Sequence, residues 1–245
     1  MLILIGVLAG LTYCGFLVYA AFPADGYGAT TVVSDMEAEG APYSALLRTL
    51  DAVSAVLTLL LAPYLWWALP RGIWRQVAVW SLVAFGVFGI PAGVVPLSCA
   101  EGSTGCPNGT ADGLQSLAHD AASIISTGAL IASAGATALA VRRTGPRWLV
   151  WAGWVTVAIQ VVSGLLVGAG EVIEDLGPMG AISQRVEIVG IAAWVVCVGV
   201  YAASHGVRAA PWARERDSVL RGPPAGAEAR GPRRSGPGPD RRYHC

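Results

Sequence analysis

The chain has 245 residues, of which 54% are hydrophobic and only 13% charged, and its formal net charge at pH 7 is zero. Soluble domains carry about 25% charged residues, so this composition excludes an ordinary water-soluble domain and places most of the chain in lipid. All 16 basic residues are Arg, and nine of them follow position 205, so the only basic segment is a short tail and no nucleic-acid partner is expected. Basic residues that are Arg alone, together with abundant Ala and Gly, favour a bacterial source.

Six apolar runs are each long enough to cross a bilayer as a helix, which takes about 20 residues. Because backbone groups cannot stay unpaired in hydrocarbon, runs of this length predict helices rather than strands. The predicted spans are 1–22, 45–69, 72–97, 116–141, 147–170 and 181–205. Pro63 and Pro91 lie inside the second and third spans, where each removes a helical hydrogen bond and predicts a kink. We therefore expect an all-α, polytopic membrane protein whose residues 1–207 form a six-transmembrane-helix bundle.

The loops between these spans divide sharply by charge. The short loops 70–75 and 142–147 contain Arg and no acid, whereas loops 23–44, 98–115 and 171–180 contain nine acidic residues and no Arg. Cytoplasmic loops of membrane proteins carry the excess of positive residues. The pattern predicts a multi-pass protein of the bacterial plasma membrane with both termini in the cytoplasm.

The tail from 208 to 245 is rich in Pro, Gly and Arg and has few large apolar residues. Such a segment cannot bury enough apolar surface to fold, so we expect a disordered cytoplasmic tail. A basic segment beside the membrane also favours anionic lipid as a partner. The sequence does not identify a protein partner.

Cys99 and Cys106 are separated by six residues in a polar loop that the charge pattern places outside the cell. Disulfides persist there, and closing so small a loop stabilises by roughly 2–3 kcal/mol in the chain-entropy account. A metal pair is the alternative, but two cysteines and one nearby His leave a zinc site short of ligands. We expect a disulfide, with no metal and no cofactor.

Ionisable residues occur near the outer ends of three predicted spans. They are Arg48, Asp51, His119, Asp120, Arg185 and Glu187. At 1.5 Å per residue they fall within roughly 10 Å of the outer surface, and residues of this kind face the bundle interior and pair with each other. They form either a structural polar clamp or a binding or catalytic pocket open to the outside. We expect Arg185 to pair with Asp120 or, as second choice, with Asp51.

Several short stretches together resemble a known family of bacterial, largely actinobacterial, six-helix membrane proteins, the "domain of unknown function 998" family. They are PLSC at 96–99, Cys106, HDAAS at 119–123, SDMEAEGAP at 34–42 and GAISQRVEIVGIAAW at 180–194. The resemblance covers nearly all of residues 1–205 and implies sites at Cys99, Cys106, His119, Asp120 and Arg185. More distantly, it extends to eukaryotic six-helix proteins linked to lipid-anchor remodelling and lipid signalling, which implies a lipid-associated role.

The favoured function is a non-enzymatic one, in which an extracytoplasmic-facing polar pocket binds a lipid headgroup or a membrane partner. The first alternative is a membrane enzyme acting on a lipid or envelope precursor, with His119 as general base and Asp120 as the group that orients it. Adjacent residues on a helix point about 100° apart, so Asp120 can orient His119 only through another group. The second alternative is a small transporter, although the chain has no convincing internal repeat.

Overall fold

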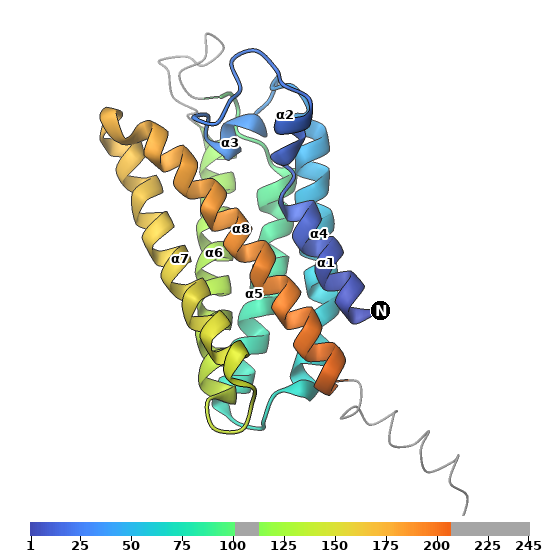
Figure 1. The fold of residues 1–245 in the computed structure, drawn as a ribbon. Coiled ribbons are helices and arrows are strands. Elements are labelled where there is room, and N and C mark those ends of the chain that lie inside the picture. The colour runs from blue at the N-terminus through green and yellow to red at the C-terminus, as the bar shows by residue number, and fades with distance from the viewer. Residues whose placement is uncertain (101–112, 207–245) are drawn as a thin grey trace, which may run out of the picture. The chain divides into compact units, whose positions relative to one another are not determined.

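The computed structural model describes residues 1–100 and 113–206 (Figure 1). Within these residues the secondary structure is helical and contains no strand beyond an isolated bridge between Ala24 and Tyr27. Cys106 and the predicted tail lie outside the described residues, so the predictions of a disulfide and of a disordered tail remain predictions.

Five helices are long and apolar enough to cross a membrane, which confirms the all-α, multi-pass class. They are α4 (Ser44–Ala68), α5 (Ile73–Val94), α6 (Leu114–Val141), α7 (Arg147–Val172) and α8 (Gly177–Tyr201), the last continued by a π-helical turn over Ala202–Gly206. These helices correspond to the second to sixth predicted spans. Local residues set two of the boundaries: α6 begins after Gly113, whose φ of 124° suits glycine alone, and α8 has Pro178 in its first turn.

The first predicted span differs from the expectation because it is broken in two. Helix α1 (Leu2–Tyr13) ends before Cys14, and the short α2 (Leu17–Ala21) follows after Phe16. With 12 residues, α1 extends about 18 Å, well short of the roughly 30 Å hydrocarbon core. The Thr12 hydroxyl bonds back to the Leu8 and Ala9 carbonyls, an arrangement that bends helices, and Gly15 follows as a poor helix former. The structure therefore does not confirm a sixth long helix.

The helices pack in a closed sequence in which α1 contacts α4 and α8, while α4 to α8 each contact the next helix along the chain (Figure 1). Small residues let two of these backbones meet: a Cβ on Gly6 of α1 would lie 3.2 Å from the Cα of Gly199 on α8. Hydroxyls join α6 to α5, since Ser126 and Ser133 donate to the Phe85 and Ala78 carbonyls at 2.9 and 2.8 Å. Helix α6 thus packs closely on α5 through polar side chains.

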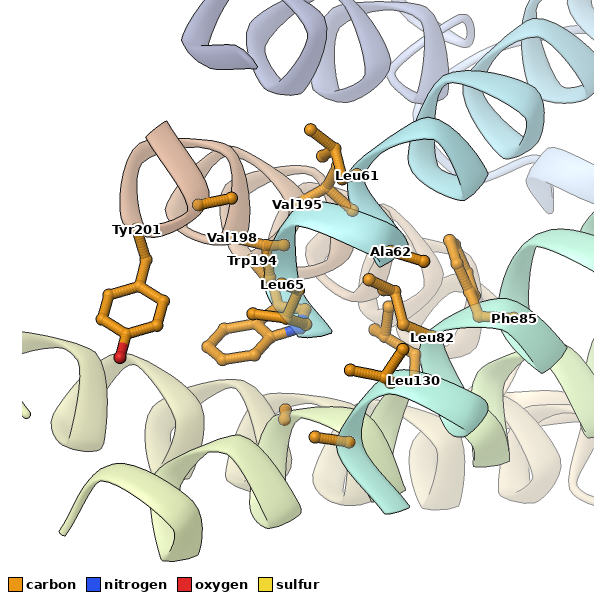
Figure 2. Packing of buried hydrophobic residues seen from close by; sticks show 14 of the residues in the cluster. Leu61, Ala62, Leu65, Leu82, Phe85, Leu130, Trp194, Val195, Val198 and Tyr201 are labelled. Atoms are coloured by element: carbon orange, nitrogen blue, oxygen red, sulfur yellow. The ribbon is translucent and has the colours of Figure 1, made fainter. Parts of the chain in front are cut away.

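The main apolar core lies between α4, α5, α6 and α8, where Trp194 packs with Leu65, Leu82 and Leu130 (Figure 2). At one end of the bundle α1 ends and α4, α6 and α8 begin, and we call this the capped end. The capping segment, residues 22–43 with the one-turn helix α3 (Val33–Met36), lies across it at the top of Figure 1. The polar residues singled out in the sequence lie at this end, on α4, α6 and α8.

Candidate functional site

Specific hydrogen bonds hold the capping segment to the helices beneath it. The Val33 backbone N–H donates to Oε1 of Gln184 on α8 at 2.5 Å, and the Glu39 backbone N–H donates to the Leu97 carbonyl at 3.0 Å. The Tyr19 hydroxyl donates to the carbonyl of Pro42. Hydrogen bonds therefore connect the capping segment to α8, to the chain after α5 and to α2, and they hold it across the capped end.

Arg48 lies in the second turn of α4 and is half-buried. Its Nε donates to the Ser44 carbonyl of the preceding turn at 3.3 Å, and the side chain forms no ion pair with any residue that the structure describes. Arg48 is also one of the residues that line a groove of about 520 Å³ on the surface of α4 and α5. The lining residues are Ala45, Arg48, Thr49, Ala52, Val53, Val56, Leu57, Gly93 and Val94.

Asp51, one turn beyond Arg48 on α4, is hydrogen-bonded to Glu37 of the capping segment. Glu37 is only 7% exposed. Burial, followed by the neighbouring Asp51 carboxyl, raises the pKa of Glu37 well above its usual value, and the Arg48 guanidinium offsets part of this rise. The close Asp51 carboxyl and the burial of Glu37 therefore both favour the protonated form of Glu37.

His119 is buried on α6, and its Nδ1 lies 2.8 Å from the Val95 carbonyl. Because a carbonyl can only accept, Nδ1 carries the proton and donates it. Its helix neighbours bind the same stretch of chain: the Ser116 hydroxyl accepts from the Ser98 N–H at 3.3 Å, and Gln115 Nε2 donates to the Pro96 carbonyl at 3.1 Å. His119 thus anchors the segment that follows α5.

Asp120, the next residue, is exposed on the outer surface of α6. The structure therefore does not bring His119 and Asp120 into one site. The reason is the helical rotation between adjacent positions, which turns one side chain into the bundle and the other out of it.

Arg185 of α8 donates to two backbone carbonyls, from Nη1 to Ala181 at 2.9 Å and from Nη2 to Gly28 of the capping segment at 2.7 Å. Its guanidinium also lies 5.8 Å from the centre of the Phe16 ring. The expected ion pair with Asp120 or Asp51 is wrong, and within the described residues Arg185 has no carboxylate partner. The capping segment supplies a carbonyl to the guanidinium instead, and Asp120 faces away from the bundle.

Glu187 joins α6, α7 and α8 into a polar contact deeper in the bundle. Its carboxylate is hydrogen-bonded to Thr127 of α6, and its backbone carbonyl accepts from Nε2 of Gln160 of α7 at 2.8 Å. Gln160 thus forms a hydrogen bond between α7 and α8. Asp51 and Glu187 both lie close enough to the Tyr13 hydroxyl of α1 to act on it electrostatically.

Sequence reasoning missed three groups that build this end: Glu37, Tyr13 and Gln184. The sequence presents Glu37 as one of several acids in an outer loop, because Asp35 and Glu39 lie two residues away on either side. Tyr13 lies within a uniformly apolar predicted span. Within the described residues, His, Cys, Asp and Glu side chains form no group of three or more that could hold a metal ion.

Comparison with known proteins places most of the chain in one family. The model of a family described as a protein of unknown function (DUF998) matches residues 7–201. No curated protein and no solved structure matches the chain. The match extends from α1 to the end of α8 and so includes the whole set of packed helices.

Proposed function

The chain belongs to the DUF998 family, and from its own residues we propose that it binds an anionic lipid headgroup at the capped end, which faces the outside of a bacterial plasma membrane. Two arginines at the headgroup depth of this end carry the proposal. Arg48 and Arg185 are both half-buried, and neither forms an ion pair with a described residue. Ionisable side chains within membrane spans are costly there, and those without a charged partner are therefore candidates for binding a charged ligand.

The chemistry of guanidinium favours phosphate as the group that is bound. A planar guanidinium offers several N–H donors in a fork that matches phosphate oxygens, and such charge-assisted hydrogen bonds are about twice as strong as neutral ones. Arg48 lies about 6 Å along α4 from its first residue, where the phosphates of a bilayer leaflet lie. The charge asymmetry of the loops supports an outward-facing capped end and cytoplasmic termini.

Two further features belong to this proposal. The broken pair α1 and α2 forms the sixth crossing, with the break covered by neighbouring helices, because irregular backbone at membrane depth is tolerated only when protein covers it. Cys99 is linked to Cys106, which would fix the loop after α5 beside the His119 anchor. An unchanged number of alkylated thiols after reduction of the purified protein would contradict this link.

The test is to identify the lipids that co-purify with the full chain in a mild detergent, using native mass spectrometry. We expect anionic phospholipid to be retained in preference to neutral phospholipid, and we expect the double variant Arg48→Gln/Arg185→Gln to lose that preference. Arg71→Gln, which removes an exposed arginine at the opposite end, is the matched control and should behave as wild type. Equal retention of neutral and anionic lipid by the wild-type protein would rule out the proposal.

A further inference from the structure

The groove between α4 and α5 points to where such a lipid sits. We propose that the groove holds one acyl chain of an outer-leaflet anionic phospholipid whose phosphate contacts Arg48. This inference rests on the proposed function and specifies its ligand and its binding site.

The size and lining of the groove suit a hydrocarbon chain attached to a charged head. Its volume of about 520 Å³ falls in the range of roughly 300–1,000 Å³ that small-molecule sites occupy. Seven of the nine lining residues are Ala, Gly, Val or Leu. The hydroxyl of Thr49 donates back to the Ala45 carbonyl at 2.7 Å, so Arg48 is the one lining side chain with N–H donors left for a ligand.

The order of groups along the groove matches the order of groups in a phospholipid. Arg48 lies about 6 Å from the start of α4, and Val56 lies about 18 Å from it, so the apolar wall continues roughly 12 Å toward the bilayer centre. A phosphate on Arg48 would leave the glycerol and the first half of a chain against Ala52, Val53 and Val56. A soluble phosphate would use the arginine and leave the apolar wall empty.

The floor of the groove exists because α5 has no side chain at Gly93. A Cβ at that position would lie 3.1 Å from the Ala52 nitrogen and 3.2 Å from the Arg48 carbonyl, so the two backbones touch there and the side chains on either side stand apart. Val53 and Val94 on the two walls are 41% and 57% exposed. They face away from the bundle, where the surrounding medium of a membrane-spanning helix is lipid.

Arg48 is better placed than Arg185 to hold the phosphate. Arg185 already uses Nη1 and Nη2 for the Ala181 and Gly28 carbonyls, whereas Arg48 uses only Nε, for the Ser44 carbonyl. Both terminal nitrogens of Arg48 are therefore available for a bidentate contact. Burial and the neighbouring Asp51 carboxyl raise the pKa of Glu37, which favours its neutral form and weakens its competition for the Arg48 guanidinium.

The experiment is a native mass spectrometry titration of the full-length protein with phosphatidylglycerol, with phosphatidylcholine of the same chains, and with soluble glycerol phosphate. Arg48→Gln removes the charge, and Val53→Trp fills the groove without touching the charge. Val189→Trp places the same ring on α8 at a lipid-facing position that is 51% exposed, and serves as the control. The melting temperature of each variant in the same detergent shows whether it is folded, and Val56→Trp replaces Val53→Trp if that variant is not.

We expect Arg48→Gln to weaken phosphatidylglycerol binding by about tenfold or more, the effect of losing one hydrogen-bonded charge of about 1.5–3 kcal/mol. Val53→Trp should weaken phosphatidylglycerol binding to a similar extent although Arg48 is present, whereas Val189→Trp should leave it unchanged. Glycerol phosphate should not compete with phosphatidylglycerol.

Two results would contradict the proposal that the groove holds an acyl chain, while leaving headgroup binding intact. The first is wild-type phosphatidylglycerol affinity in Val53→Trp together with loss of that affinity in Arg48→Gln. The second is effective competition by glycerol phosphate. A wild-type protein that binds phosphatidylcholine as tightly as phosphatidylglycerol would overturn the proposed function itself.

Discussion

Backbone carbonyls of irregular segments accept hydrogen bonds from two ionisable side chains of the capped end. His119 donates to Val95 and Arg185 donates to Gly28, and neither acceptor lies inside a helix. Carbonyls outside regular structure have no ladder partner, so a buried one needs a side-chain donor or water. The ionisable side chains of this end are thus used to fix the path of the loops, more than to neutralise one another.

His119 provides the first prediction at this scale. His119→Ala leaves the part-buried Val95 carbonyl without its donor and should destabilise the protein by about 1–3 kcal/mol. His119→Gln, which can present an amide N–H, should recover part of the loss. Asp120→Asn changes an exposed residue and should have little effect. Melting temperatures in detergent measure all three, and a larger loss for Asp120→Asn than for His119→Ala would show that the assignment is wrong.

Glu37 provides a pH prediction. Because its pKa is raised in the folded state, the folded protein binds the proton more tightly than the unfolded chain, whose Glu has its usual pKa of 4.5. The stabilisation is complete below the unfolded value and is lost as the pH rises through the raised value. The groups around the carboxyl are Asp51 and Arg48 on α4, Tyr13 on α1 and Tyr19 on α2.

We therefore expect the melting temperature of the wild-type protein to fall from weakly acidic to alkaline pH, by about 2–4 °C for each kcal/mol lost. Glu37→Gln keeps a hydrogen-bond donor at all pH values and should flatten this dependence. The conservative control is Glu39→Gln, which changes the exposed carboxylate two residues away. A melting temperature that rises with pH in the wild-type protein would contradict the raised pKa of Glu37.

At the scale of elements, the contact of α1 with α8 shows how a helix too short to cross the membrane is retained in the bundle. Gly6 and Gly10 on α1 face α8, and a Cβ at Gly10 would lie 3.0 Å from the Ala192 carbonyl. Helices in lipid gain nothing from burying apolar surface, so close backbone packing is the main attraction between them. The small residues of α8 at this contact should consequently tolerate larger side chains less well than the lipid-facing residues of α8.

This contact predicts a difference between two glycines. Gly199→Ala introduces a Cβ 3.0 Å from the Leu2 carbonyl and 3.1 Å from the Gly6 Cα, and overpacking of this kind costs about 1–3 kcal/mol. Gly164→Ala on α7 meets no atom within 4 Å and should be neutral or stabilise by about 0.4–1 kcal/mol, since alanine restricts the unfolded chain. Thermal unfolding of the two variants in detergent decides the matter, and equal melting temperatures would argue against a tight α1–α8 contact.

At the scale of the whole molecule, the loops of opposite charge lie at opposite ends of the bundle. The capping segment contains Asp25, Asp35, Glu37 and Glu39, and the loop between α6 and α7 at the other end contains Arg142 and Arg143. The helix packing therefore separates the charges along the membrane normal, as the positive-inside rule requires of a multi-pass protein.

The orientation can be tested with single cysteines at two exposed positions, Thr30→Cys in the capping segment and Thr144→Cys in the loop between α6 and α7. The native thiols outside the predicted disulfide are first replaced by Ser. A membrane-impermeant thiol reagent should label position 30 but not position 144 in intact cells, and both after lysis. Labelling of position 144 alone in intact cells would reverse the orientation and would move the proposed lipid site to the inner leaflet.

The sequence by itself determined that the protein is an all-α membrane protein, where its five long helices lie and which loops share an end. These properties follow from the length of apolar runs and from the need to pair every backbone group in lipid, and both act locally along the chain. The interior positions of Pro63 and Pro91 did not alter that outcome, because long apolar helices tolerate them.

Only the tertiary structure decided which polar groups meet. Glu37 meets Asp51 across 14 positions of sequence, and Arg185 meets Gly28 across 157, because the capping segment folds back over the bundle. The rotation of each helix about its axis is set by packing against its neighbours, which turns His119 inward and Asp120 outward. The α4–α5 groove depends in the same way on the contact at Gly93. Such contacts depend on the path of a loop and on the close packing of helices that are distant in sequence. Neither can be predicted from the residues adjacent to a given position.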